Sequence, residues 1–150
     1  MSKKFVDQIR SNNQIVISKA ITSVESGDIL NKSFLDEIYK YSTSSLRIGI
    51  TGPPGAGKST LTDKLIDKFL QSNKSVGVIA VDPTSPFTGG ALLGDRVRMN
   101  NYLWNDDVFI RSLGARGELG GLSKKTQEIG DILAASGKDI IIYETVGVGQ

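Results

Sequence analysis

The fold of this chain is decided by one stretch, which reads Ile48-Gly49-Ile50-Thr51-Gly52-Pro53-Pro54-Gly55-Ala56-Gly57-Lys58-Ser59-Thr60. Its second part matches the pattern G-x-x-x-x-G-K-[ST], in the context that the pattern requires, after an apolar strand and at the opening of a helix. A lysine and a hydroxyl at these offsets have no purpose in folding. The stretch therefore predicts a phosphate-binding loop.

Each residue type in this loop has a chemical reason. Glycines let the backbone wrap around phosphates with successive N–H groups pointing inward, and the helix N-terminus adds partial positive charge. Lys58 is expected to bind the β- and γ-phosphates as a catalytic residue, and the Ser59 hydroxyl to coordinate Mg²⁺. The predicted nucleotide-binding residues are Gly52, Pro53, Pro54, Gly55, Ala56, Gly57, Lys58, Ser59 and Thr60. The pattern does not distinguish ATP from GTP.

From Leu46 onward, the sequence predicts alternating strands and helices. The apolar runs predict strands at Leu46–Thr51, Val76–Val81, Val108–Leu113 and Ile140–Thr145. The helix after the loop is expected to turn its apolar side chains inward, namely Leu61, Leu65, Ile66 and Phe69. Another helix is expected from Ser123 to Ala135. Strands that are apolar nearly throughout are buried on both faces. The prediction is an α/β fold of the P-loop NTPase type, with a mostly parallel sheet flanked by helices.

Residues 1–42 are predicted to form a helical N-terminal extension, and residues 46–150 an incomplete P-loop domain. Ile17, Ala20, Ile21 and Val24 are spaced to form one apolar helix face. Gly27 is the expected stop of this helix. A second helix is expected to be capped by Ser33 and to carry an apolar stripe of Phe34, Leu35, Ile38 and Tyr39. We expect the extension to pack on the next domain, with docking of a partner as the alternative.

Acidic residues are expected at the carboxyl ends of the strands, where open α/β sheets bind their ligands. Asp82 follows the second strand and Glu144 ends the fourth, so either can hold Mg²⁺ directly or through water. Asp95, in the long loop after Asp82, is a third candidate oxygen ligand. The predicted metal ligands are thus Ser59, Asp82, Asp95 and Glu144, and the last two are also counted as catalytic. Capping, turn or surface ion-pair roles are the alternatives.

Two loops extend the predicted site. Gly147 stands three residues after Glu144, so its backbone N–H is a candidate sensor of the γ-phosphate and a catalytic residue. Arg96 and Arg98 are candidates to stabilise charge on the transferred phosphoryl group, with ordinary surface arginines as the alternative. Trp104 is assigned to packing in the core or at an interface.

Composition excludes several other classes of function. The 18 basic and 16 acidic residues nearly cancel, so no global charge points to nucleic acid. Neither cysteine nor histidine occurs, which excludes thiolate catalysis and the usual zinc sites in this segment, so a metal would be held by oxygen. Signal-peptide and membrane-spanning patterns are absent from the sequence, and a cytoplasmic protein without membrane insertion is expected.

Four ordered blocks of the sequence, Gly52–Thr60, Val81–Arg96, Ile110–Gly117 and Glu144–Gln150, together resemble the MeaB/ArgK family of GTPases associated with methylmalonyl-CoA mutase. The resemblance covers residues 15–150. It implies a GTP-binding and GTP-hydrolysing chaperone that gates adenosylcobalamin loading and protects the mutase. The resemblance also implies that Lys58 holds phosphate and that Gly147 belongs to a nucleotide-sensing loop. It implies that Mg²⁺ is held by Ser59, Asp82, Asp95 and Glu144.

The resemblance has a departure and leaves alternatives. The [NT]-K-x-D motif that selects guanine is absent from these residues, so GTP and GDP as ligands follow from the resemblance alone. Because family members continue with this motif and with dimerisation helices, a fragment of a homodimeric protein is expected. The same family has been labelled an arginine/ornithine (LAO/AO) transport-system ATPase or kinase, which is the main alternative. A nickel-inserting GTPase and an inactive fragment are two others.

Overall fold

Three helices open the chain and an alternation of strands and helices follows. The computed structural model describes residues 3–27, 32–42, 44–53, 55–82, 97–114 and 119–145, and for Asp82 and residues 119–123 it describes the backbone alone. The first helices are α1 (Lys3–Arg10), α2 (Gln14–Ser26) and α3 (Lys32–Tyr39). They are followed by β1 (Leu46–Ile50), α4 (Lys58–Gln71), β2 (Val76–Asp82), β3 (Val108–Gly114), α6 (Leu119–Ala135) and β4 (Ile140–Thr145). Residues 97–101, before β3, are also helical.

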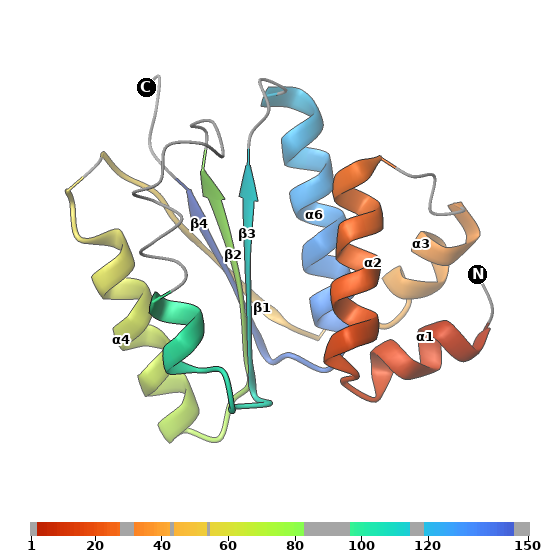
Figure 1. Ribbon diagram of the computed structural model, residues 1–150, viewed down its shortest axis with the longest axis horizontal. Helices are drawn as coiled ribbons and strands as arrows, with labels where there is room; N and C mark the ends of the chain where they lie inside the picture. The colour runs from red at the N-terminus through yellow and green to blue at the C-terminus, as the bar shows by residue number, and fades with distance from the viewer. Residues whose placement is uncertain are drawn as a thin grey trace.

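The strands form a parallel sheet in the order β1-β4-β2-β3 (Figure 1). Strand β4 lies between β1 and β2, with Ile142 opposite Ile48 on one side and Val78 on the other. Since every pair is parallel, the carboxyl ends of the described strands meet at one edge of the sheet. The predicted α/β fold of the P-loop NTPase type is confirmed in this arrangement.

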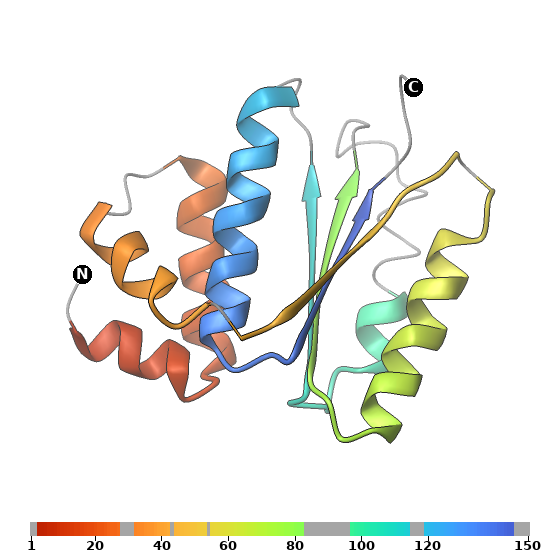
Figure 2. The same cartoon turned by 180° about the vertical axis from the view of Figure 1, so that it is seen from behind.

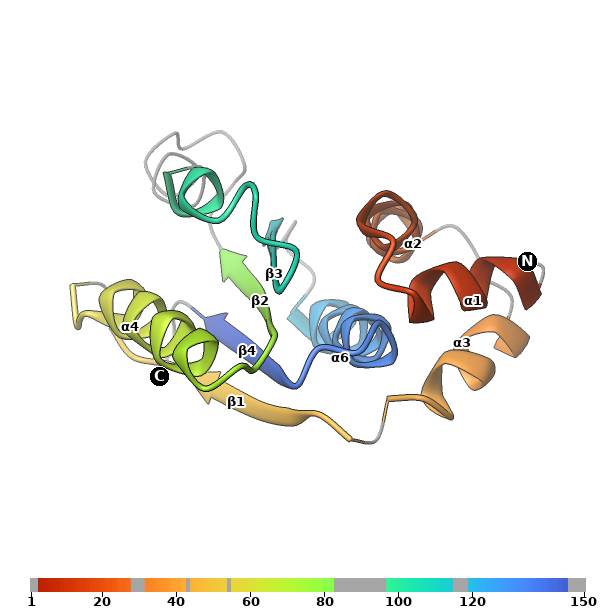
Figure 3. The ribbon, with the colours of Figure 1, turned by 90° about the horizontal axis from the view of Figure 1, so that it is seen from below.

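Helices cover the sheet on both faces. Helix α4 and residues 97–101 lie on one face and α6 on the other, with α1, α2 and α3 packed outside α6 (Figure 3). The side chains of β4 divide between these faces: Ile140 and Ile142 pack on the α4 side, whereas Ile141 packs on the α6 side. All three are buried, as the nearly continuous apolar run of this strand predicts.

The N-terminal helices share one hydrophobic core with α6 and the sheet. Helix α2 buries Ile17, Ala20, Ile21 and Val24, which is the face predicted from their spacing. Gly27 ends the helix with a φ of 72°, a left-handed conformation that glycine adopts without strain. Figure 2 shows the same stack from behind, with α2 beside α6. The extension therefore packs onto the rest of the chain, as expected.

Several local expectations are wrong. Leu61 is 49% exposed, because α4 turns Thr62 and Ile66 toward the sheet instead. Helix α3 begins at Lys32, so Ser33 lies inside it rather than at its cap, and Tyr39 is 61% exposed. Trp104 is 92% exposed and is no part of the core, whereas packing at an interface, the other expectation for it, stays a prediction.

One boundary also differs from expectation. Helix α6 begins at Leu119, four residues before the expected Ser123. Residues 97–101 form a short helix, which agrees with the helical turn that was expected within the long loop of residues 84–101. Among the helices that the structure describes, none has the length and apolar character needed to cross a bilayer.

Candidate phosphate and metal site

The phosphate loop leaves the end of β1 and enters α4. Gly55 and Gly57 have φ angles of 78° and 87°, in the left-handed region where a side chain is strained. Gly57 is the N-cap of α4, and its carbonyl accepts the first helical hydrogen bond, from Leu61 N, at 2.9 Å. These two glycines thus let the backbone turn sharply into the helix. Pro54 lies outside the described residues.

The ammonium group of Lys58 folds back over this loop. Its Nζ donates to the carbonyl oxygens of Gly52 at 2.8 Å and of Pro53 at 2.9 Å. The lysine stands in the first turn of α4, where backbone N–H groups have no acceptor within the helix. A full positive charge and the partial charge of the helix end are therefore next to the loop.

Ser59 and Glu144 lie in direct contact. Ser59 Oγ donates to Glu144 Oε1 at 2.7 Å, although the two residues are 85 positions apart in the chain. The Glu144 side chain is 11% exposed, so its charge is held largely away from water. Two of the four predicted metal ligands are thus brought together beside the phosphate loop.

The sheet register explains this meeting. Glu144 is opposite Ile50 on β1 and Ala80 on β2, so it lies near the carboxyl end of the strand next to the one that feeds the phosphate loop. The ends of β2 and β4 reach the same edge of the sheet (Figure 2). The backbone of Asp82 is at this edge as well, opposite Gly114 of β3.

Other predicted site residues are not placed by the structure. The Asp82 side chain and the whole of Asp95, Arg96 and Gly147 lie outside the described residues, so their roles stay predictions. Among the side chains that are described, no group of three or more carboxylates gathers around one point.

Arg98 reaches the same site from the short helix of residues 97–101. It is 4% exposed, so the alternative of an ordinary surface arginine is wrong. Its Nη1 donates to Glu144 Oε2 at 3.1 Å, its Nη2 to the carbonyl of Ser59 at 3.2 Å, and its Nε to Asp63 Oδ1 at 2.6 Å. The guanidinium therefore touches both residues of the Ser59–Glu144 pair.

Asp63 was not singled out from the sequence, yet a signal for it exists. On α4 the acids Asp63 and Asp67 are four residues apart, and Arg98 and Tyr102 repeat the same spacing. Tyr102 Oη donates to Asp67 Oδ1 at 2.8 Å. Arg98 and Tyr102 therefore contact Asp63 and Asp67 in the same order, one helical turn apart, along two adjoining segments. Burial, together with this hydrogen bond, raises the pKa of Tyr102 above its ordinary value, and the hydroxyl stays a donor.

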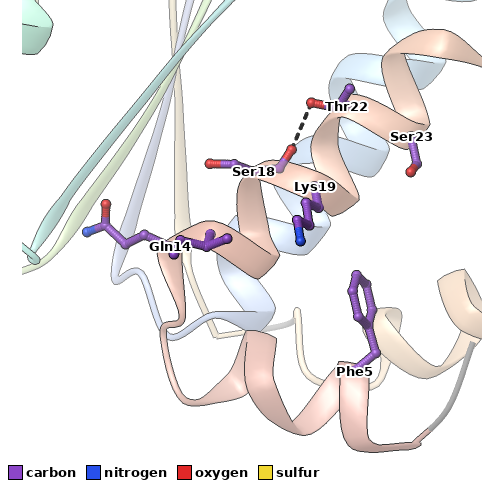
Figure 4. Close-up of a pocket in the computed structure, with 7 residues that line it drawn as sticks. Phe5, Gln14, Ser18, Lys19, Thr22 and Ser23 are labelled. Atoms are coloured by element: carbon purple, nitrogen blue, oxygen red, sulfur yellow. Dashed lines mark hydrogen bonds between the residues drawn. The ribbon is translucent and has the colours of Figure 1, made fainter.

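A separate groove lies between α1 and α2 (Figure 4). These two helices lie on the other side of the sheet from α4 (Figure 3). The groove has a volume of about 750 Å³, and Phe5 and Ile15 give it an apolar lining. Lys19 is the charged side chain among its described lining residues. In the close-up, Thr22 Oγ1 donates to the backbone oxygen of Ser18 within α2, at 2.9 Å. The groove is no part of the phosphate site.

A parallel sheet whose first strand runs through a glycine-rich loop into a helix with a lysine and a serine in its first turn defines the P-loop nucleoside triphosphatases. The model of one family in this class, described as "Methylmalonyl Co-A mutase-associated GTPase MeaB", matches residues 17–150. This chain belongs to that family, which confirms the resemblance read from the four sequence blocks.

Known relatives agree with this assignment. A Pyrococcus horikoshii protein named "Putative GTPase" is 51% identical over 147 residues, which are 98% of this chain and 46% of that protein. GTPase ArgK of Escherichia coli is 41% identical over 149 residues, 97% of this chain and 45% of its own length. The crystal structure of a LAO/AO transport system kinase superposes with a TM-score of 0.78 at 30% identity, covering 99% of this chain and 45% of that one. The chain thus spans about half the length of these relatives.

Proposed function

We propose that this chain is the nucleotide-binding part of a Mg²⁺-dependent GTPase that converts GTP and water to GDP and phosphate. The observation that carries the proposal is the 2.7 Å hydrogen bond between Ser59 Oγ and Glu144 Oε1, next to the phosphate loop. It brings a hydroxyl and a carboxylate, two oxygen ligands that Mg²⁺ prefers, to the first turn of the helix that carries Lys58.

The phosphates would be held by the loop Gly52–Thr60. Backbone N–H groups in the first turn of α4 lack acceptors within the helix and are available to an anion. Lys58 would exchange the carbonyl oxygens of Gly52 and Pro53 for oxygens of the β- and γ-phosphates. The side chain need move little, because both carbonyls belong to the loop that wraps the phosphates.

The described oxygens fit a hard divalent cation. The Ser59 hydroxyl gives its one proton to Glu144, so its lone pairs remain available to a metal ion. Glu144 Oε1 also retains acceptor capacity for a water on that ion. We therefore assign Ser59 and Glu144 to Mg²⁺, with Asp82 and Asp95 as further ligands. When bound, Mg²⁺ would supply positive charge to the β- and γ-phosphate oxygens.

Hydrolysis would proceed by in-line attack of water on the γ-phosphorus. Lys58 would stabilise the charge that develops on the phosphoryl oxygens. The Gly147 backbone N–H would contact the γ-phosphate and lose that contact when the phosphate leaves. The loop after Glu144 would then report which nucleotide is bound.

The family assignment supports a role beside a mutase. We propose that GTP turnover gates the loading of adenosylcobalamin into methylmalonyl-CoA mutase or a related cobalamin-dependent mutase, in the cytoplasm. The complete gene product is proposed to be a homodimer. Residues 1–42 would form its helical extension, and residues 46–150 the front of its P-loop domain.

A second candidate is an ATPase or kinase of an arginine/ornithine (LAO/AO) transport system. The observation in its favour is the solved structure of a protein titled as a LAO/AO transport system kinase, which covers 99% of this chain. The residues at the phosphate loop serve either nucleotide equally well. The base that is bound therefore separates the two candidates.

The test is to measure hydrolysis of GTP and of ATP by the complete gene product, each with and without its candidate mutase. GTP-selective turnover that changes when the mutase is added is the expected result. Turnover of ATP that is indifferent to the mutase would move the function to the transport hypothesis. Absence of hydrolysis with both nucleotides would contradict the enzymatic proposal itself.

A further inference from the structure

Arg98 is a buried cation whose three nitrogens all point to groups around the candidate metal site. Its side chain is 4% exposed, while its partners Glu144 and Asp63 are 11% and 45% exposed. The Glu144 carboxylate is shared between two donors, Ser59 Oγ on Oε1 and Arg98 Nη1 on Oε2. The carboxylate is therefore held at both oxygens and its plane is defined.

The geometry of a guanidinium suits this task. Its donors form a rigid planar fork, so fixing one nitrogen helps to fix the direction of the others. Asp63 Oδ1 accepts from Nε at 2.6 Å, which anchors the fork to α4. From that anchor Nη2 reaches the carbonyl of Ser59, and Nη1 reaches Glu144. One side chain thus ties the residue that carries the hydroxyl ligand to the residue that carries the carboxylate ligand.

The charges favour positioning over direct contact with phosphate. Asp63 and Glu144 each carry one negative charge and Arg98 one positive charge, so Arg98 does not by itself cancel the negative charge of these two described carboxylates, which suits a divalent cation. To reach a phosphate, the guanidinium would have to leave a carboxylate that is largely shielded from water, and unpaired buried charges are costly. Arg98 is better placed to aim Glu144 than to contact the transferred phosphoryl group.

The same contacts couple the metal site to a neighbouring segment. Arg98 lies in the short helix of residues 97–101, which follows residues 83–96 in the chain. Tyr102, directly after this short helix, attaches it to α4 through a hydrogen bond to Asp67. The Tyr102 contact is one helical turn along α4 from Asp63 and involves neither Ser59 nor Glu144. It therefore offers a matched control, since it holds the same two segments together without touching the proposed ligands.

We propose that Arg98 is a positioning residue that orients Glu144 for the metal ion, with Asp63 as its anchor. The inference rests on the proposed function, because it assumes that Ser59 and Glu144 bind Mg²⁺. It replaces the expectation that Arg98 stabilises charge on the phosphoryl group. Residues that orient metal ligands in this way change metal affinity about 10- to 100-fold when they are replaced.

The experiment is a Mg²⁺ titration of the complete gene product in the presence of fluorescent GDP, read by nucleotide binding and not by turnover. Arg98→Gln should raise the Mg²⁺ concentration for half-maximal binding about tenfold and leave GDP affinity in EDTA unchanged. Arg98→Lys should give a smaller rise, because one ammonium cannot span three acceptors. Tyr102→Phe should titrate like the wild type.

Each other outcome has a defined meaning. An unchanged or lower Mg²⁺ midpoint in Arg98→Gln would overturn the proposal, and so would an equal rise in Tyr102→Phe, which would show general loosening of the helix. Should Arg98→Gln fail to fold, Asp63→Ala removes the half-exposed acceptor of Arg98 Nε, and a rise in its Mg²⁺ midpoint is expected while no rise overturns the proposal. A wild type that binds no nucleotide, or binds it without regard to Mg²⁺, would refute the proposed function as well as this inference.

Discussion

Replacing Lys58 with alanine should weaken the binding of GTP by about 30-fold or more while leaving the fold intact. Without nucleotide, the Lys58 ammonium is bound to two carbonyl oxygens of the loop, at 2.8 and 2.9 Å. With nucleotide it would face phosphate oxygens that carry full negative charge. The loss on substitution is the difference between these two situations.

The magnitude follows from that difference. A unit-charge pair at about 4 Å near a protein surface is worth about 4 kcal/mol at an effective dielectric constant of about 20, so pairing with the β- and γ-phosphates is worth about 8 kcal/mol. The two hydrogen bonds that the charged Lys58 ammonium gives up are worth about 3–6 kcal/mol together. About 2–5 kcal/mol of binding free energy remains, which corresponds to a change in Kd of about 30-fold or more.

The assay is a fluorescence titration of the wild type and of Lys58→Ala with a labelled GTP analogue in excess Mg²⁺. Lys64→Ala is the matched control, because Lys64 is an exposed lysine on the same helix. Urea unfolding of both variants without nucleotide checks that the fold is preserved. Equal affinity of Lys58→Ala and the wild type, or an equal loss in Lys64→Ala, would refute the role of Lys58 in phosphate binding.

Two further predictions concern the framework that carries the site. Hydrogen bonds from Ser75 N and Ser75 Oγ to Asp139 Oδ2, at 2.9 and 3.0 Å, hold the pKa of Asp139 below its ordinary value. The stabilisation is therefore fully present above the unfolded-state pKa of about 3.9 and is lost as the pH falls from there through the lower folded-state pKa, so Asp139→Asn should lower the free energy of unfolding at pH 7 by more than at pH 3. Urea unfolding across this pH range measures the difference, and a loss that is constant with pH would contradict it. A β-carbon on Gly130 would overlap the Tyr143 hydroxyl, so Gly130→Ala should cost about 1–3 kcal/mol of unfolding free energy. Tyr143→Phe in the same chain should restore part of that loss, and a Gly130→Ala variant as stable as the wild type would show that the Tyr143 side chain or α6 moves aside freely.

The strands could be predicted because their signal is local. Strand β4 occupies Ile140–Thr145, the range expected from its apolar run, and β2 extends the expected range by one residue, to Asp82. A strand buried on both faces needs apolar side chains at nearly every position, whichever neighbours it has. The glycines of the phosphate loop are equally local, since the backbone conformation at Gly55 and Gly57 excludes most side chains.

The orientation of helices was less predictable, because it depends on what they pack against. The apolar positions of α4 predicted an inward-facing side that included Leu61. In the structure, the side of α4 that packs against the sheet carries Thr62 and Ile66 instead. Thr62 can be buried there because its Oγ1 donates to the Lys58 carbonyl at 2.9 Å, which satisfies the hydroxyl. Helix α6 begins at Leu119, earlier than expected, although Gly120 and Gly121 disfavour a helix locally.

The contact between Arg98 and Glu144 illustrates a third kind of limit. Glu144 could be assigned to the site from its place at a strand end, because parallel strands bring their carboxyl ends to one edge. Arg98 could be named as a candidate but not given its partners, since its anchor Asp63 is 35 residues away on a helix whose approach no local pattern reveals. The matched spacing of Asp63 with Asp67 and of Arg98 with Tyr102 becomes informative only once the two segments are known to adjoin. A sequence can therefore identify the groups that carry the chemistry of this site, while the groups that orient them emerge from the packing of α4 against residues 97–102.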